Sequence, residues 1–156
     1  MRRADRELKD KVGLEAILRE ADSCRLAFAA GGEPYIVAMN YGYSWEGELP
    51  VLYFHSAREG RKLDMMRAND RVCLQLDIGH ELLGGPTACN WGMRFASLIG
   101  YGRLCEIEDV GERRAALDRI MAHYGWQGPG DYSPPALDSV AVLRLDLEEL
   151  SGKKKG

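Results

Sequence analysis

Residues 25–41 have the sequence RLAFAAGGEPYIVAMNY, in which the turn residues GGEP separate two short apolar runs. This pattern is typical of a β-hairpin, because glycine and proline supply the backbone angles that a turn needs. It predicts one strand over Arg25 to Ala30 and a second over Tyr35 to Tyr41. Another turn at 45–50, rich in glycine and glutamate, leads into a third strand at 51–55. We therefore expect antiparallel strands to open the fold.

The rest of the chain alternates helix and strand patterns. Apolar residues three and four positions apart predict helices, and strict alternation predicts strands. The expected helices cover about 13–22, 60–68 and 109–124, and the later strands cover 71–78, 91–107 and 140–147. Glycines at 92, 100 and 102 predict bulges or bends in the longest strand. About six or seven strands with inserted helices and no regular βαβ repeat favour a mainly β, antiparallel barrel over a doubly wound sheet.

Composition narrows the class of protein. The 156 residues are 46% hydrophobic and 29% charged, which is typical of a single globular domain, here 1–156. We expect the tail at 151–156 to be flexible. A net charge of -3 gives no overall attraction to nucleic acid or anionic membranes. The four cysteines form no CxxC pair, so no metal site is expected, and the lack of a leader or apolar span predicts residence in the cytoplasm.

The stretch that carries most chemistry is 53–62, YFHSAREGRK, where a strand ends in small polar residues and a helix begins with adjacent cations. Amide groups at a helix start carry partial positive charge, so an anion beside Ser56 to Gly60 would gain hydrogen bonds. Arg61 or Lys62 would add a charge-assisted bond. The segment predicts a phosphate site, although its spacing also fits an ordinary solvated helix start.

Two further segments suit a flat ring. Trp91, Arg94 and Ser97 would offer a stacking face, a cation and a hydroxyl, while the alternative is a strand with one core-facing aromatic residue. Backbone groups of 33–41 could pair with the hydrogen-bonding edge of a planar ring, but nothing in that segment is specific by itself.

Together, these segments resemble the pyridoxamine 5'-phosphate oxidase-like superfamily of FMN-binding split β-barrels, and within it the nitroimidazole-resistance (Nim-like) branch. The resemblance covers almost the whole chain. It rests on the order and spacing of Glu33-Pro34-Tyr35, Asn40-Tyr41-Gly42-Tyr43, Leu52 to Ala57, Gly60-Arg61-Lys62, Asn69 to Cys73, and Trp91 to Gly102.

The resemblance implies a homodimer with flavin mononucleotide (FMN) at the subunit interface. The phosphate would lie near Ser56 and Arg61 or Lys62, the strand from Tyr35 would follow the flavin ring, and the 91–97 segment would contribute nearby or from the partner chain. The implied cofactor-binding residues are Tyr35, Val37, Met39, Asn40, His55, Ser56, Ala57, Gly60, Arg61, Lys62, Trp91, Arg94 and Ser97.

The expected function is a flavin-dependent oxidoreductase acting on small molecules, with nitroaromatic reduction as the activity that the resemblance offers. His55 is the candidate proton donor, or else a structural histidine that orients the loop. His80 and His123 are interpreted as structural. Oxidation of vitamin B6 is not expected. The true oxidases of the superfamily carry tryptophan and arginine residues of a pyridoxal-phosphate pocket towards the C-terminus, and Arg144 is an unconvincing substitute for them. The alternatives are a non-catalytic protein that stores or senses flavin, and the same barrel binding F420 or haem.

Overall fold

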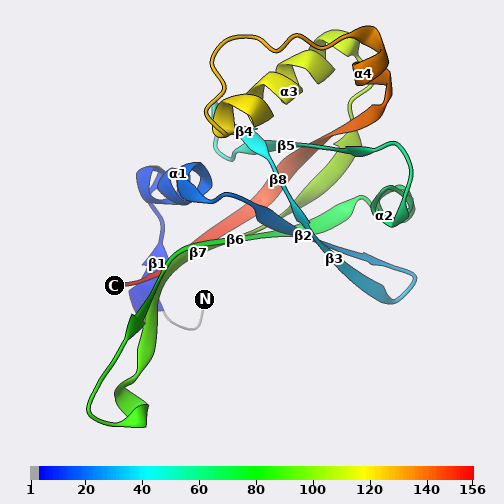
Figure 1. Cartoon of the computed structure of the whole chain (residues 1–156). Helices are drawn as coiled ribbons and strands as arrows, with labels where there is room; N and C mark the ends of the chain where they lie inside the picture. Colours follow the sequence, from blue (N-terminus) through cyan, green and yellow to red (C-terminus); the bar gives the residue numbers. More distant parts are fainter. Residues whose placement is uncertain (1–3) are drawn as a thin grey trace.

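The computed structural model describes residues 4–156 as one antiparallel sheet with helices inserted between its strands (Figure 1). The strands are β1 (Glu7–Leu8), β2 (Cys24–Ala30), β3 (Glu33–Met39), β4 (Gly42–Ser44), β5 (Val51–Ala57), β6 (Arg71–Leu83), β7 (Gly92–Glu106) and β8 (Val140–Lys155). The helices are η1 (Ala4–Arg6), α1 (Lys11–Glu20), α2 (Arg61–Ala68), η2 (Ala88–Asn90), α3 (Val110–His123) and α4 (Pro134–Asp138).

The strand order is β3-β2-β6-β7-β8-β5-β4, and β1 pairs with β8. The expected mainly β, antiparallel fold with inserted helices is confirmed. The sheet has eight strands rather than six or seven. The prediction missed β1 and β4 because strands of two and three residues are too short to show a period.

β2 and β3 form the predicted hairpin. Ala30 pairs with Glu33, so Gly31 and Gly32 make a two-residue loop. Their φ angles of 60° and 84° are those of a turn that needs two residues in the left-handed region, which glycine adopts without a steric penalty. β3 therefore begins at Glu33, two residues before the predicted start, and ends at Met39.

β7 bends where the sequence predicted. Its register with β8 shifts between Tyr101 and Gly102. A side chain at position 102 would place its Cβ 2.1 Å from the carbonyl oxygen of Asp146, so glycine is required there. This bulge lets one long strand curve and take part in two regions of the sheet.

The expectation of a flexible tail at 151–156 is wrong as far as Lys155. Residues Ser151 to Lys155 pair with β7, and Gly152 also pairs with Leu8 of β1. The sequence did not indicate this part of β8, because its run of lysines shows no alternation of apolar and polar residues. Pairing of the backbone on both sides orders it nevertheless.

Two helices begin at aspartate caps. Asp10 accepts a hydrogen bond from the amide of Gly13 at 2.8 Å, so α1 begins at Lys11 and ends at Glu20 instead of covering 13–22. Asp109, the cap of α3, accepts from the amide of Glu112 at 2.9 Å. None of the helices within residues 4–156 is both long and apolar enough to cross a membrane.

The main core lies between the sheet and helices α1 and α2, and a smaller core lies under α3 and α4. Tyr41 is fully buried between them and donates a hydrogen bond to the carbonyl of Leu18 at 2.6 Å. The hairpin of β6 and β7 projects away from this body as a long arm, on the side away from α2 (Figure 1). The turn from β5 into α2 and the arm of β6 and β7 thus carry two separate sets of polar residues.

Candidate functional site

The first set of polar residues surrounds the turn from β5 into α2. Gly60 precedes the helix with φ 128°, an angle that favours glycine, and offers no side chain to cap the first turn. The first amide groups of a helix have no partners inside it, so they are available to an anion. The turn therefore has the backbone chemistry of a phosphate site.

The two cations at the start of α2, Arg61 and Lys62, lie close to the hairpin strand β3. The guanidinium carbon of Arg61 lies 4.9 Å from the ring centroid of Tyr35. The ammonium of Lys62 lies 3.5 Å from the sulfur of Met39. Partial burial lowers the pKa of Lys62. The structure thus brings together two pairs of predicted site residues, and the members of each pair are more than 20 positions apart in the sequence.

β3 forms one edge of the sheet, since β2 is its single neighbour among the described strands. Tyr35, Val37 and Met39 are the more buried residues of the strand, while Ile36 and Ala38 are exposed. The backbone on the outer side of β3 has no strand partner within residues 4–156. It is free to pair with the polar edge of a ligand, as the sequence suggested for this segment. Asn40 follows it and is exposed.

Ser56 and His55 lie on opposite faces of β5. Ser56 is buried, and its hydroxyl donates to the carbonyl of Ala57 at 2.8 Å, so it already has an acceptor next to the turn. His55 and Ala57 are exposed. The imidazole of His55 makes no hydrogen bond or ion pair with another residue of 4–156, so no neighbouring carboxylate or carbonyl orients its ring.

Arg58 holds the turn in place, a role that the sequence analysis did not predict. Its guanidinium donates to the carbonyl of Asp138, at the end of α4, at 3.1 Å and lies 3.9 Å from the carboxylate of Glu106. The basic residues of the turn thus divide into one that anchors it and two that face β3. Spacing alone could not separate these roles, because all three are cations within five residues.

Trp91, Arg94 and Ser97 lie on the projecting arm and are not brought to α2 within one chain (Figure 1). The indole nitrogen of Trp91 donates to the carbonyl of Gly85 at 3.0 Å. Arg94 forms an ion pair with Glu81 of the adjoining strand. Within one chain these residues therefore lie away from α2, and their contribution nearby or from the partner chain stays a prediction.

Comparison with known proteins adds the family. The family model described as pyridoxamine 5'-phosphate oxidase matches residues 10–154. The chain belongs to this family. Residues that the family model covers include both the turn at α2 and the arm, so the family expected from the sequence is confirmed.

Two solved structures are similar to the chain over most of its length. A candidate 5-nitroimidazole antibiotic resistance protein from Bacteroides thetaiotaomicron is 36% identical, with 94% of this chain and 85% of that chain covered and a TM-score of 0.82. An FAD-binding protein from Mesorhizobium loti is 30% identical, with 97% and 98% covered and a TM-score of 0.67.

A more distant structure, the FAD and haem binding protein from Mycobacterium smegmatis, is 16% identical, with 97% and 74% covered and a TM-score of 0.80. This likeness shows the split-barrel fold alone. No curated protein matches the chain significantly.

Proposed function

We propose that the chain is a flavoprotein that binds FMN, with the phosphate at the start of α2 and the ring along β3. The observation that carries this proposal is the placement of Arg61 and Lys62 over the inner residues of the edge strand. A terminal phosphate needs cations and free amides, and a flavin ring needs a flat contact and a strand edge with unpaired backbone groups. This chain offers both within a few residues of each other.

FMN suits these residues better than FAD, because FMN ends in a phosphate that carries close to two negative charges. Two adjacent cations at a helix start match that charge. In FAD the phosphates are internal, and a second nucleotide needs room beyond them. The FAD-binding relative from Mesorhizobium loti makes FAD the competing cofactor. Arg61 and Lys62 would also fit the phosphate of F420, so F420 and haem stay alternatives that identification of the bound ligand tests.

We further propose a homodimer, in which the arm of one subunit reaches the flavin of the other. Support comes from a row of neighbouring residues across four strands of the open sheet face: Ile36 opposite Ala27, Ala27 opposite Cys73, and Cys73 opposite Tyr101. Ile36 and Tyr101 are 66% and 41% exposed, which is unusual for large apolar side chains on paired strands. A second copy would cover this row.

The proposed activity is reduction of small molecules, with a nitroaromatic compound as substrate and a reduced nicotinamide as donor. The bound flavin would supply the electron chemistry. His55 is the residue of this chain placed to give a proton near the flavin. Its lack of an orienting partner favours the second candidate function, a protein that stores or senses flavin without catalysis.

Two measurements on the purified protein test these proposals. Mass spectrometry of the ligand released by denaturation should give FMN; FAD, F420 or haem would overturn the cofactor assignment. Reduced nicotinamide and a nitroimidazole should then be turned over repeatedly. A single bleaching of the flavin without turnover would leave the cofactor proposal intact and support storage or sensing in place of catalysis.

A further inference from the structure

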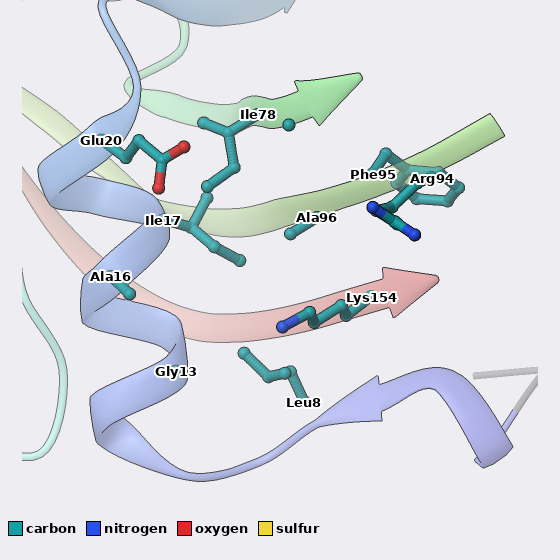
Figure 2. A pocket seen from close by; sticks show the side chains of 11 residues that line it. Leu8, Gly13, Ala16, Ile17, Glu20, Ile78, Arg94, Phe95, Ala96 and Lys154 are labelled. Atoms are coloured by element: carbon teal, nitrogen blue, oxygen red, sulfur yellow. The ribbon is translucent and has the colours of Figure 1, made fainter. Parts of the chain in front are cut away.

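A hollow of about 260 Å³ lies between α1 and the sheet, away from the turn at α2 (Figure 2). Its floor is a row of paired residues on three strands, Ile78 of β6, Ala96 of β7 and Lys154 of β8. Figure 2 shows Ile17 and Glu20 of α1 facing this row from the helix side. Arg94 lies at one end of it.

The hollow exists because small residues stand where the core has large ones. In the neighbouring row the residues on β6 and β7 are Leu76 and Leu98, both fully buried. At the hollow the β7 position is Ala96, and the facing positions of α1 are Gly13 and Ala16. Because the large residues of the core keep α1 and the sheet at their normal separation, the small residues near Ala96 leave a space between them.

The charged side chains around the hollow differ in whether they have a partner of opposite charge. Arg94 is paired with Glu81. The ammonium of Lys154 makes no ion pair or hydrogen bond with a side chain or carbonyl of residues 4–156, and it does not pair with Glu20 across the hollow. Two cations thus lie on the sheet side and one carboxylate lies on the helix side. A ligand with a single negative charge is favoured at the end near Lys154 and repelled from the end near Glu20.

We propose that this hollow, the α1 pocket, binds a small aromatic carboxylate, with its ring against Ile17 and Ile78 and its carboxylate at Lys154. The volume supports a single ring, because an apolar cavity of about 150 Å³ is enough to hold benzene. The apolar walls would bury the ring, and the lysine would supply one charge-assisted hydrogen bond. The pocket shares Arg94 with the arm that is proposed to reach the flavin of a second subunit, but its other lining residues are outside the implied flavin contacts, and the inference does not depend on flavin binding.

Equilibrium dialysis of the purified, flavin-containing protein with benzoate tests the proposal, with uncharged benzamide as the matched ligand. We expect saturable binding of one benzoate per chain and much weaker binding of benzamide. Lys154→Met should weaken benzoate binding by about ten-fold, the loss of one charge-assisted bond in a half-open site. Ala16→Leu, which fills the hollow while keeping the charges, should also abolish binding.

Lys153→Met is the matched control, since Lys153 lies on the opposite face of β8, with its ammonium 5.4 Å from the ring centroid of Phe95. It should bind benzoate as the unchanged protein does. Flavin absorbance and the unfolding temperature, recorded for every variant, show whether cofactor and fold are retained. Absence of saturable benzoate binding, equal binding of benzamide, or equal losses in the Lys153 and Lys154 variants would overturn the proposal, including the case in which a second subunit fills the pocket.

Discussion

The guanidinium of Arg61 lies over the ring of Tyr35, 4.9 Å from its centroid, and so connects the start of α2 to the edge strand β3. The next residue, Lys62, contacts Met39, which lies four residues after Tyr35 on β3. These contacts define the place at which a phosphate and a flat ring would meet. The account of function rests on this pair of cations.

Replacing Arg61 and Lys62 by alanine should strip FMN from the protein. Each residue would contribute a charge-assisted hydrogen bond, so each single change is expected to weaken FMN binding by about ten-fold or more. Flavin absorbance per chain after purification measures the effect. Arg67→Ala is the control, because Arg67 is in the last turn of the same helix and its guanidinium faces Asp64 at 3.6 Å.

Substitution of His55 separates catalysis from cofactor binding. If His55 gives a proton during reduction, His55→Gln should lower the rate of nitroimidazole reduction by about 100-fold while flavin content stays unchanged. An unaltered rate in the variant would make His55 a structural residue.

Tyr41 ties the end of α1 to the sheet. Its buried hydroxyl donates to the carbonyl of Leu18 at 2.6 Å and lies 3.2 Å from that of Ala21. Tyr41→Phe removes the donor and leaves the carbonyl of Leu18 without this partner, so it should lower the free energy of unfolding by about 1–3 kcal/mol. Urea denaturation measures this. Tyr43→Phe is the control, since Tyr43 is only half-buried, and an equal loss there would contradict the assignment.

Stability should fall in alkaline solution because of Cys24. Burial raises the pKa of its thiol from 9.0 to about 12. The folded protein therefore keeps this proton to a higher pH than the unfolded chain does. The resulting stability is present below pH 9 and is lost as the pH rises towards 12, by up to about 1.4 kcal/mol per pH unit.

Cys24→Ala should reduce this dependence between pH 9 and pH 10, while the contributions of Tyr41 and Cys105, whose pKa values burial also raises, stay the same in both proteins. Urea denaturation at a series of pH values measures the slope. Cys89→Ala, at an exposed cysteine, should leave it unchanged. Parallel curves for the unchanged protein and the Cys24 variant would rule out the buried thiol as the cause.

The local patterns of the sequence were enough to predict the hairpin and the bulge at Gly102, because each depends on a few neighbouring residues. The strand at Ser151 to Lys155 was missed because its order comes from pairing with β1 and β7. Arg61 and Lys62 were predicted as cations of one site, but their contacts with β3 are tertiary. The α1 pocket gave no signal in the sequence, since small residues on a helix and a strand become a hollow once the two pack together.

The most direct test of the phosphate assignment compares FMN with riboflavin, which lacks the phosphate. Both dissociation constants are measured by fluorescence titration of flavin-depleted protein, for the unchanged chain and for the variant with Arg61→Ala and Lys62→Ala. We predict that the unchanged protein prefers FMN by about 100-fold or more and that the double variant loses most of this preference. A preference for FMN that survives in the double variant would contradict the account, because the phosphate would then be bound elsewhere.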